Sequence, residues 1–426
     1  MKITIVSWGT FGDIVPYIAL SLGLQRAGHT VQLATDDEHQ EFVNRNGVNF
    51  VSISSNVETI ENLKPFEYPK PSIHNTFRSV IAQSRVLEER KHIVLSECWR
   101  ICQDTDAIIF GEGAHPVYEI IEKLDIPSYA AFAQPHQPTR AFPVPYMPCR
   151  FDFGETYNWL SYPLFDQLCW QFFRQTLNEW RQKNLNLPAL PTWAGIMRRI
   201  HHRQLPCLYS YSPSVLPKPS DWPDWVHVTG YWFLDRPADW QAPSDLVDFL
   251  KAGAPPIYIS NNLNKDLVTK EVVLEVLALT KQRIIVQRLD DDTELPDEMF
   301  NIKQWIPHEW LFPQVATIVH HGGSGTTMSS LRAGIPTITI PSLGDQFFWG
   351  SRVAKLGLGP LPILRKQFST KKLANAILAA ISDQKMQDRA VAMGKRIQVE
   401  KGVIQAVEAF HAHLPSHQYH QSVYIA

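Results

Sequence analysis

The chain has 426 residues, of which 44% are hydrophobic and 19% charged, and its formal net charge is −2. A chain of this length is too long to fold around one hydrophobic core, so two domains of roughly 200 residues each are predicted. The hydrophobic content excludes a disordered chain, and the lack of a basic excess argues against a protein that binds nucleic acid through its phosphates.

The first half of the chain alternates predicted strands with predicted helices. Helices are expected at residues 15–27 and 116–124, and strands at residues 3–7, 31–34, 107–110, 128–132, 208–211 and 226–229. This alternation predicts a parallel sheet covered by helices on both faces. Met1 and Lys2 lead directly into the first strand without a secretion signal, and no run of about 18 apolar residues predicts a membrane span. We therefore expect a cytoplasmic protein.

Between the fourth and fifth of these strands lies a segment rich in Phe, Tyr and Trp, residues 132–173. Prolines at positions 135, 138, 143, 145 and 148 interrupt its first part, so an irregular segment is expected there rather than a helix. The segment is too apolar to be disordered. Its rings either form the core of the domain or line an apolar pocket, for which the candidates are Phe132, Phe142, Tyr146, Trp159, Phe165 and Trp170.

A polar, proline-rich stretch at residues 235–243 is the best candidate for a linker, and the strand–helix pattern restarts after it. Helical residues are expected at 270–279 and 370–413, and strands at 256–260, 283–287 and 337–340. The predicted division is a first domain at residues 1–234, a linker at 235–245, a second domain at 246–395 and a terminal helix and tail at 396–426.

A glycine-rich turn in the second domain carries the strongest functional signal. The apolar residues 316–319 lead into His320, His321, Gly322, Gly323, Ser324, Gly325 and Thr326, and a helical pattern starts at Thr327. A strand, a glycine-rich turn and a helix start together form a common phosphate site, because the free N–H groups and the dipole of the helix favour an anion.

The stretch WIPHEWLFPQVATIVHHGGSGTTMSSLRAGIPTITIPSLGDQFFWGSRVAKLGLGP, residues 305–360, resembles the donor-sugar box of family 1 glycosyltransferases with the GT-B fold. SWGTFGDIVPYIALSLGLQRAGHTV, residues 7–31, resembles the first strand, loop and helix of the branch that includes sterol, glycopeptide and rhamnolipid glycosyltransferases. The resemblance implies an α/β architecture of two Rossmann-like, doubly wound domains that face each other across a cleft. The acceptor would bind to the first domain and the donor to the second, with the last helix crossing back to the first.

The resemblance also implies roles for residues of the donor box. His321, with Gly322, Gly323, Ser324, Gly325 and Thr326, would hold the diphosphate of a nucleotide sugar. Asp345 and Gln346 would bind sugar hydroxyls, and Trp305 would hold the nucleotide base. The structural alternatives are a capping turn for His321, a helix-start residue for Asp345 and a core residue for Trp305.

On the acceptor side, Asp13 after Gly12 matches the general base that removes the proton of the acceptor hydroxyl. Its alternative role is structural, because Asp favours helix starts regardless of function. His136 is a second candidate base. The acceptor-binding residues would be Gly12, Phe132, His136, Phe142 and Tyr146, and the family's fold type needs no metal and no further cofactor.

The predicted function is that of an inverting glycosyltransferase, which moves a hexose or deoxyhexose from a UDP- or dTDP-sugar to a hydroxyl of an apolar small molecule or lipid. Two departures from the family pattern support a rival hypothesis, a binding or scaffold protein without turnover. The loop at residues 260–265 has no glycine, and Asp290, Asp291 and Asp292 replace a glycine-rich stretch.

The basic run at residues 198–203 is the only dense one in the chain. It is interpreted either as a solvated face or as a surface that docks on an anionic membrane, which would make the protein peripheral at the inner membrane face. The five cysteines are scattered, and we expect reduced thiols rather than a metal site.

Overall fold

The computed structural model describes residues 1–53, 93–147, 153–237, 239–260, 266–289 and 295–415. They divide into two compact units. The first unit contains the described residues up to Leu234 together with those from Lys401 onward, and the second runs from Asp235 to Glu400. The helix at residues 384–399 is continuous, so the chain leaves the second unit at residue 400 rather than at the expected residue 395.

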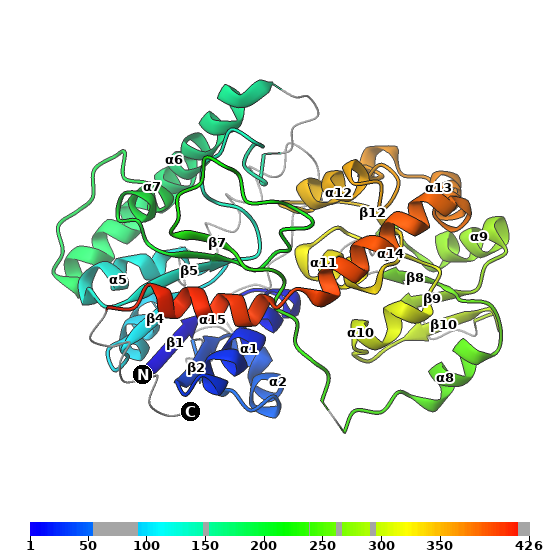
Figure 1. The fold of residues 1–426 in the computed structure, drawn as a ribbon, viewed down its shortest axis with the longest axis horizontal. Coiled ribbons are helices and arrows are strands. Elements are labelled where there is room, and N and C mark those ends of the chain that lie inside the picture. The colour runs from blue at the N-terminus through cyan, green and yellow to red at the C-terminus, as the bar shows by residue number, and fades with distance from the viewer. Residues whose placement is uncertain (54–92, 148–152, 238, 261–265, 290–294, 416–426) are drawn as a thin grey trace. The chain divides into compact units, whose positions relative to one another are not determined.

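The first unit is built on a seven-stranded parallel sheet of order β3-β2-β1-β4-β5-β6-β7 among the described residues (Figure 1). The strands are β1 (Lys2–Val6), β2 (Thr30–Thr35), β3 (Asn49–Ser52), β4 (Ala107–Phe110), β5 (Ser128–Phe132), β6 (Cys207–Tyr209) and β7 (Val226–Val228). The expected strands are confirmed, and β3 is an edge strand that the sequence pattern did not reveal. The order of connection reverses between β1 and β4, which makes the loops after these two strands the place where an open α/β sheet binds ligands.

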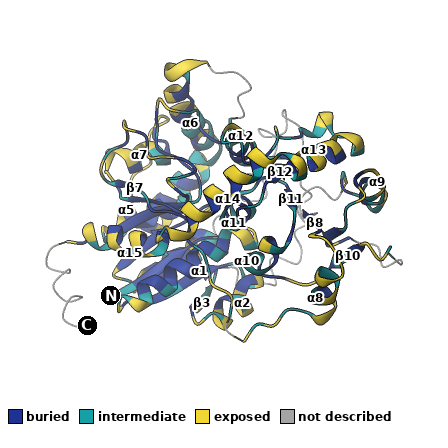
Figure 2. Cartoon of the chain, turned by 45° about the vertical axis from the view of Figure 1, so that its right-hand side comes forward, coloured by how far each residue is buried: buried dark blue, intermediate teal, exposed yellow. Residues whose placement is uncertain are grey.

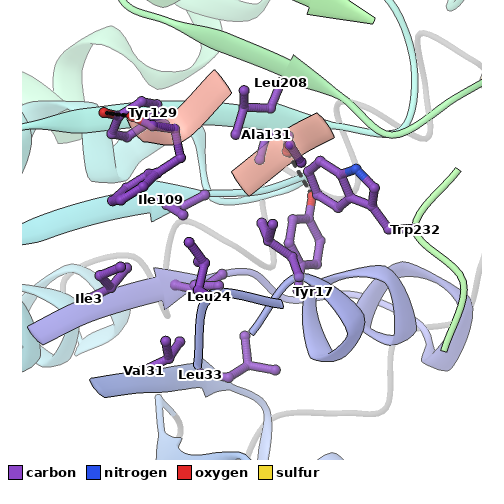
Figure 3. Close-up of a cluster of buried hydrophobic side chains, with 14 of the residues drawn as sticks. Ile3, Tyr17, Leu24, Val31, Leu33, Ile109, Tyr129, Ala131, Leu208 and Trp232 are labelled. Atoms are coloured by element: carbon purple, nitrogen blue, oxygen red, sulfur yellow. Dashed lines mark hydrogen bonds between the residues drawn. The ribbon is translucent and has the colours of Figure 1, made fainter. Parts of the chain in front are cut away.

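One face of this sheet is covered by α1 (Phe11–Arg26) and α15 (Gly402–Ala412). Alternate residues of β1, Ile3 and Ile5, are fully buried in the core cluster shown in Figure 3. A Cβ atom at Gly23 would lie 2.3 Å from a methyl group of Val403, so α1 and α15 approach each other at a position that only glycine permits. The C-terminal helix is therefore part of the core of the first unit.

The remaining α-helices among the described residues of this unit are α2 (Gln40–Arg45), α5 (Tyr118–Leu124), α6 (Gly154–Trp180) and α7 (Ile196–His202). The basic run lies on α7 and just beyond it, and part of it faces the interior. Arg199 forms ion pairs with Glu119 and Glu122, which also pair with the buried Arg181. Arg203 instead pairs with Asp125 at the surface, so the run is in part an internal ionic network through Arg199 and in part a solvated face.

The second unit is built on a five-stranded parallel sheet of order β10-β9-β8-β11-β12 among the described residues. The strands are β8 (Ile257–Ser260), β9 (Ile284–Gln287), β10 (Met299–Ile302), β11 (Thr317–His320) and β12 (Thr337–Thr339). Alternate residues of β8 enter different cores: Ile257 and Ile259 join one cluster, and Tyr258 joins the other. Both faces of β8 are thus buried, and Figure 2 colours each residue of the chain by its burial.

Two groups of helices cover these faces. Apolar residues of α9 (Lys270–Thr280) and α13 (Thr370–Ser382) pack in the cluster that contains Ile257. Residues of α8 (Ser244–Lys251) and α10 (His308–Leu311) pack in the cluster that contains Tyr258. The other helices of the unit are α11 (Ser324–Ala333), α12 (Gln346–Lys355) and α14 (Gln384–Val399). None of the helices in the described part of the chain has the length and apolar character needed to cross a membrane.

Two histidine pairs attach α15 and the residue after it to the first unit. The Nε2 atoms of His29 and His411 are 2.8 Å apart, and so are those of His227 and His413. Each pair needs one donor and one acceptor nitrogen, so two protonated rings cannot form it. Burial, reinforced by the neighbouring ring, lowers the pKa of His29 and of His227 to about 4, and burial lowers the pKa of both partners.

We expect acid to destabilise the first unit through these pairs. The pKa of each histidine is lower in the folded state than the unfolded value of about 6.5. The unfolded state therefore binds more protons, and stability is lost as the pH falls from about 6.5 towards 4. Thermal unfolding followed by circular dichroism between pH 7.5 and 4.5 should show a falling Tm.

The double variant His411→Gln/His413→Gln should show a flatter dependence of Tm on pH over this range. The control is His202→Gln, because His202 is exposed on α7. An unchanged pH dependence in the double variant would contradict the role given to the two pairs.

Candidate active site

In the first unit, polar side chains gather at the loops after β1 and β4. Asp13 comes from the first turn of α1, and Glu112 from the turn after β4. Tyr17 links the two regions, because its hydroxyl accepts a hydrogen bond from the N–H of Glu112 (3.0 Å) and donates one to the carbonyl of Ala131 (2.8 Å; Figure 3). The chain reversal between β1 and β4 therefore brings two carboxyl groups into one region.

Asp13 lies in the first turn of α1, the position that its structural alternative predicts. Its Oδ2 atom accepts hydrogen bonds from the backbone N–H of Thr10 (2.8 Å) and from the Thr10 hydroxyl (2.7 Å), so the carboxylate caps α1. Burial nevertheless raises the pKa of Asp13 above its usual value, although the Thr10 hydrogen bonds oppose this shift. Gly9 has φ +142°, and a Cβ atom there would lie 2.8 Å from Asp13 Oδ2, so the loop requires glycine beside the carboxylate.

Glu112 is the residue of this region that the sequence analysis missed. Its Oε1 atom accepts from the N–H of Ala133 (3.2 Å), and its Oε2 atom lies 3.4 Å from His136 Nε2 and 3.5 Å from the Tyr146 hydroxyl. Burial raises its pKa to about 8; the nearby His115 opposes this shift, and the charge of Asp13 adds to it. The available signal was a glutamate between two glycines directly after a buried strand.

The predicted acceptor residues fall into two groups. Phe132, His136 and Tyr146 lie together: the ring centroids of Phe132 and His136 are 4.4 Å apart, and those of His136 and Tyr146 are 5.6 Å apart. Tyr146 in turn stacks on Phe165 at 5.2 Å. Phe142 instead contacts Trp222 at 6.2 Å.

Three further candidates lie outside this aromatic group. Trp170 is a buried residue of α6, and its indole N–H donates to the carbonyl of Pro191 (3.2 Å). Trp159 is 44% exposed. Gly12 is exposed at the start of α1.

In the second unit, the glycine-rich turn joins β11 to α11. The helix begins at Ser324, with Gly323 as its N-cap, three residues before the start suggested by the apolar pattern. The helix can start early because Ser, Gly and Thr are tolerated in a first turn, where no apolar face is needed. Ser324, Gly325 and Thr326 therefore supply first-turn N–H groups, which have no intrahelical partner and lie at the positive end of the helix dipole.

His321 lies over the start of α11. A Cβ atom at Gly323 would be 2.4 Å from His321 Nε2, so the ring occupies the space that a side chain would need. Its Nδ1 atom is buried without a hydrogen-bond partner, and burial lowers its pKa to about 4. The ring is thus neutral at pH 7 and can donate one N–H to a ligand.

His320 has a different position from its neighbour. It is buried, and its Nδ1 atom accepts a hydrogen bond from the N–H of Gly322 (3.0 Å), which fits an orienting role. Gly322 has φ +90°, and a Cβ atom there would be 2.9 Å from the carbonyl oxygen of Gln346. The turn therefore packs tightly against the start of α12.

Asp345 and Gln346 stand at the start of α12. Asp345 is the N-cap residue of α12, the position that its structural alternative predicts, but its side chain forms no capping hydrogen bond with this helix. Gln346 is buried, and its Oε1 atom accepts from the N–H groups of Ser342 (2.8 Å) and Leu343 (3.1 Å). The loop thus holds the amide oxygen in place. Trp305 is 39% exposed between β10 and α10, in contrast to a core tryptophan.

The two stretches that depart from the family pattern lie in the second unit. The glycine-free loop begins at Ser260, whose hydroxyl contacts Gln287 Oε1 at 3.4 Å, and its residues 261–265 lie outside the described residues. Asp290, Asp291 and Asp292 also lie outside them.

Two family models match this chain. The glycosyltransferase family 28 N-terminal domain matches residues 3–143, and the erythromycin biosynthesis protein CIII-like C-terminal domain matches residues 270–401. The first match contains Asp13, Glu112 and His136, and the second contains the glycine-rich turn.

Among curated proteins, a sterol 3-beta-glucosyltransferase of Arabidopsis thaliana is 35% identical over 97% of this chain and 68% of its own length. A sterol 3-beta-glucosyltransferase of Emericella nidulans is also 35% identical over 97% of this chain. The match covers 30% of that fungal protein, so the chain spans less than a third of its length.

Solved structures agree on the fold. The glycotransferase of kitacinnamycin has a TM-score of 0.69 and 19% sequence identity, and the match covers 97% of this chain and 99% of that one. The glycosyltransferase VinC in complex with dTDP has a TM-score of 0.65 and 16% identity over 96% of this chain and 98% of its own.

The geometry of the turn predicts a specific coupling between Gly323 and His321. Gly323 has φ −62°, which any residue can adopt, so Gly323→Ala introduces a clash with the His321 ring without backbone strain. We expect this variant to bind UDP or dTDP more weakly, as His321→Ala should. A hydrogen bond from the ring to a diphosphate contributes on the order of 1.5–3 kcal/mol, or roughly 10- to 100-fold in affinity.

Isothermal titration of the two single variants and the double variant provides the measurement. In the His321→Ala background, Gly323→Ala should have little further effect, because the clashing ring is gone. Ser329→Ala, one turn further along α11, serves as the control and should bind like the parent. Additive losses in the double variant would show that His321 does not mediate the effect.

Proposed function

The chain belongs to the family 1 glycosyltransferases of the GT-B fold, and we propose that it is an inverting transferase that uses a nucleotide sugar. It moves a hexose or deoxyhexose from a UDP- or dTDP-sugar to a hydroxyl of an apolar acceptor. The observation that carries this proposal is the start of α11, where His321 has a buried Nδ1 without a partner beside first-turn N–H groups. Such a constellation suits the diphosphate of the donor.

The proposed role of Asp13 is that of general base. As the acceptor oxygen attacks the anomeric carbon, Asp13 takes its proton, and the bond between that carbon and the diphosphate oxygen breaks. Burial favours this role, because a carboxylate with a raised pKa accepts a proton more readily than an ordinary one. His136 is a poorer candidate, since burial lowers the pKa of His136 to about 3.

The donor unit would stabilise the leaving group. His321 and the N–H groups of Ser324, Gly325 and Thr326 would donate hydrogen bonds to the diphosphate as its charge grows. The dipole of α11 adds to this stabilisation, so we propose that the diphosphate needs no metal ion. Asp345 and the Gln346 amide group would bind sugar hydroxyls, and Trp305 would contact the base.

A sterol-like alcohol is the acceptor we favour. The relatives from Arabidopsis thaliana and Emericella nidulans carry the name sterol 3-beta-glucosyltransferase. The aromatic group of Phe132, Tyr146 and Phe165 near Glu112 offers apolar area for such a molecule. We propose a cytoplasmic location with peripheral contact to the inner membrane face, where an apolar acceptor would be found.

A scaffold protein without turnover is the second candidate, and the glycine-free loop at residues 260–265 favours it. One experiment separates the two. Thermal shift with UDP-glucose, dTDP-glucose, UDP and dTDP should reveal a ligand that raises the Tm, since saturation at 100 times the Kd stabilises by about 2.7 kcal/mol. Mass spectrometry should then find a glycosylated sterol when ergosterol or cholesterol is added. A rise in Tm without product would support a binding protein without turnover, and no rise with any of these nucleotides would contradict the proposed transferase and favour the scaffold.

Asp13→Asn should lower the chemical rate by roughly 10²- to 10⁴-fold while the affinity for the donor stays nearly unchanged. Asparagine retains an oxygen that can accept the Thr10 hydrogen bonds but does not accept the substrate proton. Single-turnover kinetics with a saturating donor provides the measurement.

Thr10→Ala is the matched control. It removes the hydroxyl that donates to Asp13 and weakens the cap, yet it keeps the carboxylate. We expect this variant to retain most of the chemical rate. Comparable losses in the two variants would assign Asp13 a capping role alone.

A further inference from the structure

The first unit contains a mixed cluster of Glu112, His115 and His136 that the proposed transfer does not use. Each residue offers one ligand atom, and these three atoms all lie within 4.8 Å of one another. The cluster joins three parts of the chain: the turn after β4, the short 3-10 helix at residues 115–117, and the irregular segment after β5.

The nitrogen of His136 is the central observation. Its Nε2 atom is buried and has no hydrogen-bond partner, although it lies 3.4 Å from Glu112 Oε2. The side chain is only 6% exposed, so bulk water does not supply this nitrogen with a hydrogen bond. A buried nitrogen without a partner is costly unless a ligand occupies the space that it faces.

The separation of these two atoms suits a metal ion. Zinc lies about 2.0–2.1 Å from imidazole nitrogens and from carboxylate oxygens, so two ligand atoms of a tetrahedral site are roughly 3.3–3.4 Å apart. The distance of 3.4 Å between His136 Nε2 and Glu112 Oε2 agrees with this value. The ligand atom of His115 would need to move by about 1.5 Å at most to reach the same spacing, given the limit of 4.8 Å.

The charge of the cluster also favours a cation. Among the ion pairs of the described residues, Glu112 has no lysine or arginine partner and pairs only with His136. Burial keeps both imidazoles neutral by lowering the pKa of His115 to about 4 and that of His136 to about 3, and neutral imidazole is the form that binds metals.

We propose that Glu112, His115 and His136 form a binding site for a divalent transition metal, with zinc as the best fit. Two imidazoles and one carboxylate are a ligand set that zinc accepts, and three protein ligands leave one position for water or another oxygen donor. His115 is the least buried of the three ligands and provides the side from which the ion enters.

Groups around the ligands would support the site. The hydroxyl of Tyr146 reaches Glu112 Oε2 at 3.5 Å and itself accepts a hydrogen bond from the Gln134 amide. The N–H of Ala133 holds the other carboxylate oxygen at 3.2 Å. The carboxylate is thereby oriented with one oxygen towards His136, as outer groups orient metal ligands in general.

The site is independent of the proposed metal-free donor site, because it lies within the first unit and none of its ligands has a role in the transfer derived above. A cation there would offset both the burial of the Glu112 carboxylate, which is the main cause of its raised pKa, and its repulsion by Asp13. Metal binding can therefore be measured without nucleotide sugar or acceptor, and its failure would leave the proposed transfer untouched.

The test is titration of the full chain with Co²⁺ as a spectroscopic probe for zinc, after removal of metals by chelation and without an affinity tag. We expect one Co²⁺ per chain, with visible absorption typical of four-coordination, and displacement by Zn²⁺. Glu112→Gln and His136→Gln should each weaken binding by roughly 100-fold or more, because even outer-shell changes cost 10- to 100-fold.

Two controls address other sites on the chain. His411→Gln/His413→Gln removes the two histidine pairs and should bind Co²⁺ like the parent. Thiolate ligation by the free cysteines would produce intense near-ultraviolet charge-transfer bands, which the proposed oxygen and nitrogen ligands do not. Glu112→Gln keeps the size of the side chain, and its circular dichroism and its Tm without metal show whether it folds.

The proposal is overturned if the parent shows no four-coordinate spectrum, or if a folded Glu112→Gln binds as tightly as the parent. It is equally overturned if binding disappears in the His411/His413 variant or carries the thiolate bands. If both ligand variants fail to fold, the Tm of the parent is measured with increasing Zn²⁺. The proposal requires that the Tm rises and that the rise saturates at one equivalent of Zn²⁺ per chain. No rise in Tm overturns the site.

Discussion

Every other feature of this protein depends on the need of a parallel strand to be covered on both faces. The central strands β1 and β8 have buried residues at successive positions, and in the second unit the apolar ones enter separate cores on the two sides of the sheet. Helices must therefore return across each face, and the strands all point the same way. As a consequence, the loops after the strands meet at one edge, where polar groups can gather without being part of a core.

The two units use this edge in different ways. In the second unit, the turn after β11 presents backbone N–H groups and a neutral imidazole, which together attract an anion without a full positive charge. In the first unit, the loops after β1 and β4 hold two carboxyl groups whose pKa values are raised by burial. The edge of the second unit thus suits the binding of phosphate, and the edge of the first unit suits proton transfer and the binding of cations.

Glycine sets the shape of both edges. Gly9 leaves room for the Asp13 carboxylate, and Gly323 leaves room for the His321 ring. In each case the functional side chain lies where a Cβ atom would otherwise be. The glycines therefore position these side chains, and their role goes beyond flexibility of the turn.

The sequence by itself determined the local elements and the motifs. Most strands and the helices α1, α5 and α9 could be predicted, because apolar periodicity and turn residues act over short distances along the chain. The long helix α6 was missed. The residues of the glycine-rich turn, Asp13 and the pair Asp345–Gln346 could also be identified, since each follows a strand in a recognisable pattern. The edge strand β3 was missed, because its residues are only partly buried and carry little apolar pattern.

Only the tertiary structure decided which distant residues meet. The position of Glu112 between two glycines after β4 did not reveal its partners, because its raised pKa and its contact with His136 come from burial between segments that are 24 residues apart in sequence. Arg199 became an interior partner of Glu119 rather than a solvated charge, and α15 joined the core next to α1 across the whole length of the chain. Burial and charge pairing depend on the topology of the sheet, which brings together groups that no local pattern connects.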